Sequence, residues 1–383
     1  MLWLFACTPD VRGLYESERE AALTVATERP RDWDADLRVQ IAEPDLEAAV
    51  TAAVRDAVAD AKPLQLSLGV TTASVRPRLS VRHAKLGASD ACASCLSFDT
   101  KLDGHATWEV AGARGDFPFE VAAEGVLAVE VADGHRVRVR PQRIGAVRVK
   151  LGDLEGLRVN PSNLLQDWIR DELKEDLPPI HLVDLDPAAL PVRDLRLRTG
   201  DGAVRVEALT DVPGARPASA ASKLERGVRV SVSETALTGL ARRAAYEQGT
   251  LEMEVAADPR ALRVEGDRFT LSLRLWRLVG RGWWRDYEVT GGLAVVNGRL
   301  KLTPEDVREV DRSPGAGLVD PLAALFQNRI VEAIADVLHR SLPASRAEKV
   351  GGVRLRAEAQ RVEGRDGTLH LEGSLAPVAP DKP

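Results

Sequence analysis

The sequence predicts an α+β protein of two tandem units, each a curved antiparallel sheet wrapped around long amphipathic helices, with an elongated overall shape. Two observations lead to this prediction. Stretches in which apolar and charged residues alternate, such as VRVRPQRIGAVRVKL, are typical of strands with one solvated face. In addition, three segments of the first half recur in the second half in the same order, which indicates an internal repeat.

The composition excludes several classes of protein. Of 383 residues, 44% are hydrophobic and 29% charged, as in globular domains and unlike disordered or fibrous chains. The net charge of −6 argues against nucleic acid as the main partner, because phosphate binding needs a basic surface. Aromatic residues make up only 4%, so we expect an aliphatic core. The sequence contains no run of about 18 apolar residues and therefore predicts no membrane-spanning helix.

The first recurring segment combines a strand with the start of a helix. Residues 37–50 read LRVQIAEPDLEAAV and residues 228–241 read VRVSVSETALTGLA, so that Val39 corresponds to Val230 and Leu46 to Leu237. In both copies an alternating apolar pattern is followed by apolar residues at helical spacing.

The second recurring segment is a β-hairpin. Its turns, Asp133-Gly134 and Asn297-Gly298, favour the two positive φ angles of a type I′ turn. Each hairpin is expected to end at a proline, Pro141 or Pro304, because proline cannot donate a hydrogen bond to the next strand.

The third recurring segment is an amphipathic helix, LLQDWIRDEL at 164–173 and LFQNRIVEAI at 325–334. Together the three segments give the domain boundaries. We expect a lipobox-like N-terminus and tether at 1–33, a first unit at 34–209, a Pro- and Ala-rich linker at 210–226, a second unit at 227–376, and a flexible tail at 377–383.

The first residues, MLWLFACTPD, point to a compartment. They resemble the lipobox of bacterial lipoproteins, in which a small residue precedes the cysteine that is lipidated, here Cys7. Only six residues precede Cys7, fewer than a basic region plus an apolar region of about 7–15 residues require. A start codon placed too far downstream would explain this. The resemblance implies a periplasmic lipoprotein anchored through Cys7 to a membrane, with the outer membrane preferred; the alternative is an ordinary N-terminus.

Cys92 and Cys95, in DACASCLSF, form a CxxC pair. A zinc site needs a second pair of ligands at suitable spacing, which the sequence does not offer. A redox motif belongs at a helix start, whereas the flanking residues here indicate a loop and a strand. If Cys7 marks an exported protein, a disulfide that staples this loop is the preferred interpretation.

The order of elements, with strand–turn–helix openings such as VSVSETALTGLA, resembles the tubular lipid-binding (TULIP) superfamily, which includes bactericidal/permeability-increasing protein. The resemblance covers both units and rests on element order, not on a diagnostic motif. It implies two units joined end to end, in each of which a curved antiparallel sheet wraps around a long helix. The helices here look shorter and richer in alanine than in the animal proteins.

The resemblance also implies a function: binding, and with it transport, of phospholipid, fatty acid or sterol in an apolar channel between helix and sheet. No other cofactor is expected. The alternative is that the apolar helix faces are filled cores, as in any α+β domain, and that the chain is a structural envelope lipoprotein that docks other envelope proteins. The residues expected to line the channel are Leu46, Val50, Val54, Leu165, Trp168, Ile169, Leu237, Leu240, Phe326, Ile330 and Ile334.

Trp283 and Trp284, in LVGRGWWRDYEV, form a conspicuous pair near an expected hairpin tip. Neighbouring residues of a strand point to opposite faces, so one indole should be exposed unless something covers it. A tryptophan pair flanked by Arg281 and Arg285 suits a membrane interface. The alternative is that one indole closes the end of the core while the other packs on a neighbouring loop.

The motifs of common enzyme classes are missing from the sequence. It contains no GxSxG, no GxxxxGK[ST], no HExxH and no Gly-rich dinucleotide turn after a strand. The six histidines are isolated from one another, and we expect neither a metal site nor an enzymatic activity.

Overall fold

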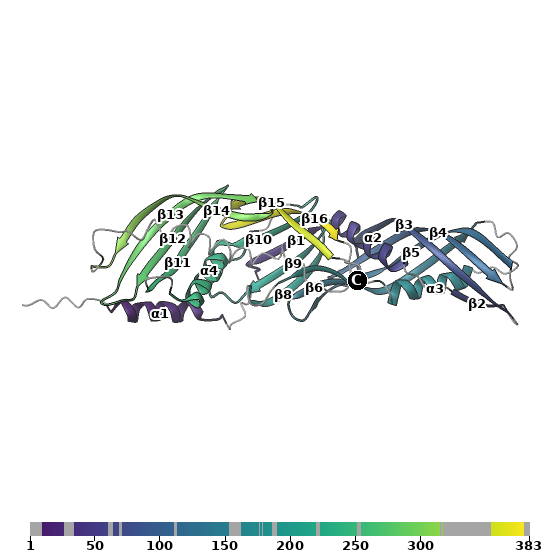
Figure 1. Cartoon of the computed structure of the whole chain (residues 1–383), viewed down its shortest axis with the longest axis horizontal. Helices are drawn as coiled ribbons and strands as arrows, with labels where there is room; N and C mark the ends of the chain where they lie inside the picture. The colour runs from purple at the N-terminus through teal and green to yellow at the C-terminus, as the bar shows by residue number, and fades with distance from the viewer. Residues whose placement is uncertain are drawn as a thin grey trace, which may run out of the picture.

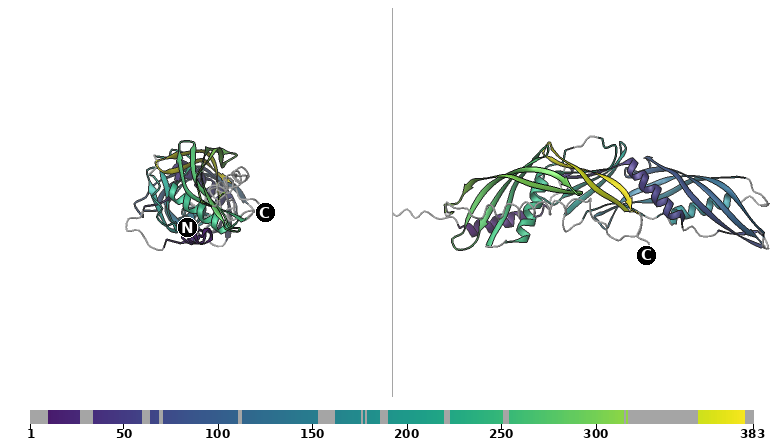
Figure 2. Two further views of the ribbon diagram at one scale, coloured as in Figure 1. Left: turned by 90° about the vertical axis from the view of Figure 1, so that its left-hand side faces the viewer. Right: turned by 45° about the horizontal axis from the view of Figure 1, so that its top comes forward.

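The computed structural model describes residues 10–26, 34–59, 64–68, 71–110, 113–152, 162–175, 177, 179–185, 190–219, 223–250, 254–314, 316 and 354–378. The molecule is elongated (Figure 1) and roughly round when viewed along its length (Figure 2). In these ranges, strands dominate and form a 12-stranded and a four-stranded sheet. No helix of the described residues is long and apolar enough to cross a membrane.

The elements follow one another along the chain in the order α1 (Val11–Leu23), β1 (Leu37–Ala42), α2 (Glu43–Ala59), β2 (Leu64–Leu68), β3 (Thr71–Ala88), β4 (Cys95–Val110), β5 (Ala113–Ala132), β6 (Arg136–Leu151), α3 (Ser162–Glu175), β7 (Ile180–Asp184), β8 (Val192–Gly200), β9 (Ala203–Thr210), β10 (Val228–Ser233), α4 (Glu234–Gln248), β11 (Val255–Glu265), β12 (Arg268–Arg277), β13 (Trp283–Val296), β14 (Arg299–Arg312), β15 (Arg354–Arg365) and β16 (Thr368–Val378).

One end of the molecule, at the right of Figure 1, consists of the long antiparallel strands β3 to β6 with helices α2 and α3. Helix α2 contacts β3, and α3 contacts β6. In β5, Phe117, Phe119 and Val121 are buried while the residues between them are exposed, which is the alternation that the sequence predicts. Among the described residues the longest helix is α2, with 17 residues.

Aromatic rings lie over glycines on neighbouring strands in this part of the sheet. Phe119 stands opposite Gly104, Trp108 opposite Gly115, and Phe98 opposite Gly125. A Cβ atom built at Gly104 would lie 2.2 Å from Cζ of Phe119. The glycines therefore leave the space that the rings fill. A strand can bend at such a glycine while the ring still covers its backbone.

The cross-strand pairing gives a first testable expectation. Replacing Gly104 by alanine should destabilise the protein by about 1–3 kcal/mol, because the Phe119 ring must move out of its position in a filled core. Urea unfolding followed by tryptophan fluorescence would measure it. Gly87→Ala is the matched control, since the nearest atom to its added Cβ is the movable Ser97 hydroxyl oxygen at 3.1 Å. Equal midpoints for the two variants would refute the expectation.

The other end of the molecule consists of the four-stranded sheet β11–β12–β13–β14 with helices α4 and α1. Helix α4 contacts β11 and buries Ala236, Leu237, Leu240 and Ala241, one face at helical spacing. Its N-cap is Ser233, whose hydroxyl accepts a hydrogen bond from the backbone N–H of Ala236.

The centre of the molecule, which we call the central sheet, is the part of the 12-stranded sheet with the order β8–β9–β1–β10–β16–β15. The first recurring segment lies here: β1 and β10 are antiparallel neighbours, with Val39 directly opposite Val230. Strands β9 and β8 follow β1 on one side, and β16 and β15 follow β10 on the other. The two sides of the β1–β10 pair are thus built alike.

The hairpin turns have the predicted conformation, but the strands do not end at the prolines. Asp133-Gly134 and Asn297-Gly298 each combine two positive φ angles. Strand β6 continues through Pro141 and β14 through Pro304, and the pairing register shifts at both prolines. A β-bulge leaves one residue unpaired, so a proline without an N–H is tolerated there and the strand goes on.

The expected tether, linker and tail also differ from the structure where it describes them. Residues 11–23 form helix α1, which buries Val11 and Tyr15. Part of the expected linker is anchored: Val212 and Ala218 are buried, and the Ala218 N–H donates to the Ala35 carbonyl. Strand β16 extends to Val378, into the expected tail. The polar composition of these segments predicted flexible chain. A few apolar side chains in each of the first two are nevertheless enough to pack it against the rest of the molecule.

Candidate functional site

The first candidate site is the apolar interior between the helices and the sheets. Leu46, Val50 and Val54 of α2 and Leu165 and Ile169 of α3 are all buried in one connected hydrophobic core. Trp168 packs against it and is partly buried. Leu237 and Leu240 of α4 belong to the same core. The predicted lining residues Phe326, Ile330 and Ile334 lie outside the described residues.

Leu46 of α2 borders a small cavity in the apolar interior. A cavity of about 40 Å³ lies beside Leu46 and is lined also by Leu86, Leu96 and Val204. Pockets for small molecules have volumes of about 300–1,000 Å³, so an acyl chain would enter here only if side chains moved apart.

A second candidate site lies under helix α1 and escaped the sequence analysis. Tyr15 of α1 packs on Tyr246 of α4, with ring centroids 5.4 Å apart, and on Trp276 of β12, at 6.0 Å. With Val11 and Ala256 these residues form a small apolar cluster apart from the main core, which we call the aromatic cluster. The spacing of Val11, Tyr15, Glu18 and Ala22 on one helical face was the signal that could have revealed it.

A ring of charged groups borders the aromatic cluster. Arg242 of α4 donates from Nε to Asp258 Oδ1 at 2.6 Å and from a terminal nitrogen to Glu18 of α1. Arg260 of β11 lies 3.3 Å from Asp258 and 3.0 Å from Glu18. Asp258 is completely buried. Each arginine thus bridges the same two carboxylates, one on the sheet and one on α1.

Burial and charge act on the titratable groups of this site. Burial raises the pKa of Tyr246, and the neighbouring Asp258 carboxylate raises it further. Burial also raises the pKa of Tyr15. For Glu18, burial alone would raise the pKa, but the hydrogen bonds and charges of Arg242 and Arg260 outweigh it, so the pKa is lowered. The phenols are therefore neutral and Glu18 is ionised at neutral pH.

The two adjacent tryptophans are both half-buried. The Arg274 guanidinium stacks 3.8 Å from the centroid of Trp284, which packs against the aromatic cluster. The Arg285 guanidinium lies 5.3 Å from Trp283, at the start of β13 beside the turn. Trp284 thus packs against the aromatic cluster, while Trp283 lies at the start of β13.

A disulfide joins Cys92 and Cys95 in the loop before β4. The loop is held by its neighbours, because the Thr199 hydroxyl of β8 donates to the carbonyls of Ala93 and Cys95. The N–H of Val129 in β5 donates to the Ser94 carbonyl. Cys7 lies outside the described residues.

The buried side chain of His370 connects the central sheet to the segment 211–219. His370 of β16 is within hydrogen-bond distance of the Ser231 hydroxyl, 2.8 Å from Nδ1, and of the Ser219 hydroxyl, 3.3 Å from Nε2. Burial lowers the pKa of His370, and the charges of Arg365 and Arg229 add to this effect against the weaker influence of Glu363 and Glu372. Among the described residues no three His, Cys, Asp or Glu side chains are grouped to hold a metal ion.

His370 gives a pH-dependent expectation. Because its pKa is lower in the folded than in the unfolded chain, where it is about 6.5, its contribution to stability is complete above pH 6.5. That contribution is lost as the pH falls through the folded pKa. The melting temperature of His370→Gln should therefore fall less than that of wild type on acidification below about pH 6.5. His105→Gln, at an exposed position, is the control, and parallel pH profiles for wild type and His370→Gln would refute the expectation.

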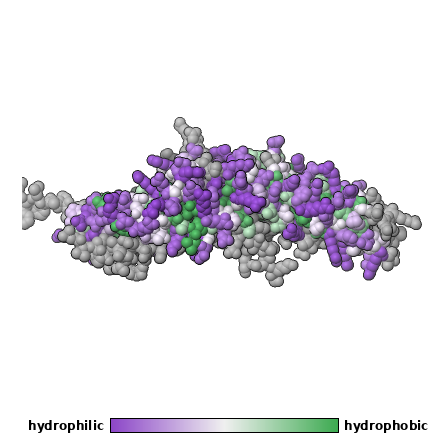
Figure 3. All heavy atoms as spheres, turned by 90° about the horizontal axis from the view of Figure 1, so that it is seen from above, coloured by the Kyte–Doolittle hydropathy of each residue, from purple (hydrophilic) through white to green (hydrophobic). Residues whose placement is uncertain are grey.

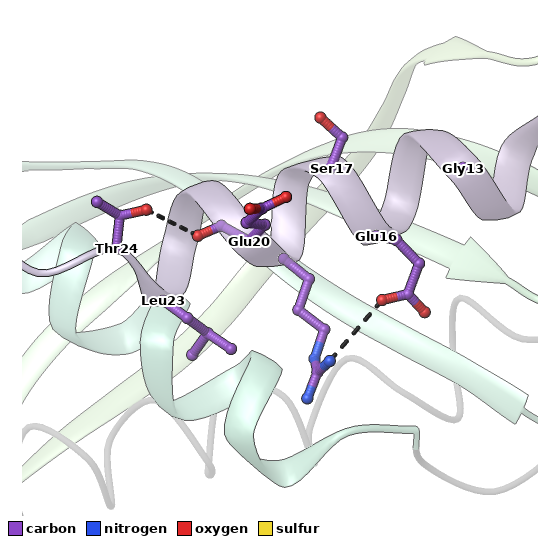
Figure 4. A pocket seen from close by; sticks show the side chains of 7 residues that line it. Gly13, Glu16, Ser17, Glu20, Leu23 and Thr24 are labelled. Atoms are coloured by element: carbon purple, nitrogen blue, oxygen red, sulfur yellow. Dashed lines mark hydrogen bonds and ion pairs between the residues drawn. The ribbon is translucent and has the colours of Figure 1, made fainter.

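The outer side of α1 borders a wide open depression of about 700 Å³ (Figure 4). Its lining combines polar and apolar side chains, among them Leu23 and Glu16, and Glu16 pairs with Arg19 of the same helix at 3.8 Å. The face of the molecule in Figure 3 is likewise largely polar, with apolar side chains in interrupted patches.

No protein-family model matches the chain, and no curated protein matches it in sequence. Among solved structures, a lipopolysaccharide binding protein is similar with a TM-score of 0.47 and 11% identity, over 91% of this chain and 100% of that one. The P47 protein of Clostridium botulinum E1 is similar with a TM-score of 0.38 and 9% identity, over 90% and 100%. These identities and TM-scores are too low to carry an inference about this chain's ligand.

Proposed function

We propose that the chain is a lipid-binding protein of the bacterial envelope, built of two TULIP-like units that open with β1–α2 and β10–α4. The observation that carries the proposal is the hydrophobic core, which continues as one connected set of side chains from α2 and α3 to α4 and the four-stranded sheet. Aliphatic side chains between short helices and curved sheets can separate to admit an acyl chain. Each buried methylene of such a chain contributes about 0.8 kcal/mol.

The side-by-side placement of β1 and β10 supports the two-unit part of the proposal. A repeat whose first strands pair in antiparallel fashion, Val39 opposite Val230, joins two copies end to end with their helices pointing to opposite ends. The elongated outline follows from this junction.

Native mass spectrometry tests the lipid proposal. The full chain with Cys7→Ser, purified from a bacterial host, should carry phospholipid, fatty acid or sterol at near-stoichiometric ratio, and lipid extraction would name the class. An unrelated envelope protein purified in the same way is the control. If the protein emerges bare and stays bare after incubation with mixed liposomes, the proposal fails.

A structural envelope protein is the second candidate, and the small volume of the cavity beside Leu46 favours it. In that case the polar outer faces of the sheets would dock other envelope proteins, and no lipid would bind in the native mass spectrometry experiment. Crosslinking in cells would then identify the partners.

We propose further that Cys7 is lipidated and that the α1 end of the molecule faces the membrane. A Cβ atom built at Gly282 would lie 3.1 Å from Val11, so the β12–β13 turn abuts the start of α1, which begins four residues after Cys7. Val279 of this turn is 44% exposed, and Trp283 adjoins the turn. A lipid on Cys7 and these side chains could reach the same bilayer.

The anchoring proposal predicts that wild type fractionates with membranes and that Cys7→Ser is released from them. Trp283→Ser in the Cys7→Ser background should further weaken sedimentation with liposomes, whereas Val296→Ser, an exposed apolar residue at the opposite end of β13, should not. Equal fractionation of wild type and Cys7→Ser would refute the lipid anchor.

A further inference from the structure

Helix α1 is held to the molecule by few side chains. Of its residues only Val11 and Tyr15 are buried, and most of the others are exposed. Both belong to the aromatic cluster, which is separate from the main core. Loss of α1 would uncover Tyr246, Ala256 and Trp276 without opening the main core.

The two arginines next to the cluster are held in place without α1. Arg242 donates to Asp258 through Nε at 2.6 Å and through a terminal nitrogen at 3.3 Å, and Arg260 lies 3.3 Å from the other side of that carboxylate. Asp258 is on β11 and fully buried. The terminal nitrogen of Arg242 that contacts Asp258 also donates to Glu18, and a terminal nitrogen of Arg260 donates to Glu18 at 3.0 Å, so the sheet and α4 direct two guanidinium groups toward one anionic group.

We infer that α1 occupies a binding site for an anionic amphiphile, in which Glu18 stands in the place of the anionic headgroup and Tyr15 and Val11 stand in the place of the adjoining apolar chain. The inference rests on the proposed lipid-binding function. It adds that the headgroup is anionic and that helix α1 must leave the site before the ligand binds. Guanidinium pairs recognise carboxylate and phosphate by the same hydrogen bonds, so a fatty acid and an acidic phospholipid both fit.

Two further features support this inference. When Glu18 leaves, two arginines face the single carboxylate of Asp258, and this excess positive charge is compensated by an anion. The indole Nε1 of Trp276, buried at the base of the cluster, has no hydrogen-bond partner within the described ranges. A polar group of a ligand would satisfy it, as buried polar groups usually are satisfied.

Fluorescence quenching by 9,10-dibromostearate tests the inference, because its bromine atoms quench tryptophans in contact with the chain, here Trp276 and Trp284. Glu18→Gln weakens the attachment of α1 and should lower the concentration for half-maximal quenching about tenfold relative to wild type. Glu16→Gln is the matched control, with the same change of charge on the outer side of the same helix, and should behave as wild type. Adding Arg260→Gln to Glu18→Gln should abolish the gain.

The alternatives give different outcomes. Equal quenching of wild type, Glu18→Gln and Glu16→Gln would overturn the inference, while lipid found by native mass spectrometry would still uphold the proposed function. A gain that survives Arg260→Gln would overturn the headgroup assignment. Absence of lipid in both experiments would overturn the proposed function itself. Tyr15→Ser, with Glu18 intact, provides a second way to loosen α1 and should give the same gain, with near-ultraviolet circular dichroism confirming that each variant is folded.

Discussion

Replacing Arg242 by methionine is expected to destabilise the protein by about 3–5 kcal/mol. The guanidinium bridges Asp258, which is completely buried, and Glu18, and its removal leaves the Asp258 carboxylate without its shortest hydrogen bond. Asp258 then keeps the longer contact with Arg260, at 3.3 Å, and the loss of its stronger partner is costly because the surrounding side chains cannot solvate a buried charge as water does. Urea unfolding at neutral pH measures the change.

The double variant Arg242→Met/Asp258→Leu shows whether the cost comes from the charge left behind. Removing both partners takes away the buried carboxylate that has lost its Arg242 partner, so much of the lost stability should return. Arg82→Met is the surface control: Arg82 pairs with Asp103 at 2.5 Å, but both side chains are exposed, and no measurable change is expected. A loss in Arg82→Met as large as that in Arg242→Met would contradict the role assigned to burial.

The second large effect is expected in helix α3, where two adjacent leucines differ only in their surroundings. Leu165→Ala should destabilise the protein by about 2–5 kcal/mol, because the side chain is fully buried in the main core and its removal leaves a cavity. Leu164, the next residue, is 46% exposed, so Leu164→Ala is the matched control with a small effect. Thermal unfolding monitored by circular dichroism compares the pair.

The same pair of variants bears on the proposed function. A ligand that binds only the folded protein raises its stability. If the acyl chain of the lipid found by native mass spectrometry lies against α3, adding that lipid should therefore recover part of the stability lost in Leu165→Ala. Leu164→Ala would gain no more than wild type. Equal melting temperatures of the two variants without lipid would show that α3 does not bury Leu165 as the structure has it.

Regular patterns along the sequence predicted the regular parts of the fold. The alternation in residues 137–151 and the helical spacing in 164–173 predicted β6 and α3, since the side chains of one strand or helix face follow from local geometry alone. The Asp-Gly and Asn-Gly pairs likewise predicted their turns, because few residues tolerate two positive φ angles. The prolines did not end their strands, because a bulge depends on the partner strand and not on the proline alone.

The second candidate site could not be predicted, because its members come from distant segments. Glu18 and Arg242 lie 224 positions apart and meet only when α1 packs beside α4. The sequence around Glu18 is polar, so composition favoured a tether, and only the common face of Val11 and Tyr15 pointed to a packed helix. The indole of Trp276 drew less attention than the adjacent Trp283 and Trp284, although it is the more deeply buried.

The sequence by itself determined regular elements such as β6 and α3 and their apolar faces, because these properties depend on residues a few positions apart. Only the tertiary structure decided that β1 lies beside β10, that α1 covers the aromatic cluster, and that Arg242 and Arg260 converge on Glu18 and Asp258. The physical reason is that pairing of strands, burial of charges and closure of a cluster are properties of surfaces in contact, and those surfaces exist only after the chain has folded.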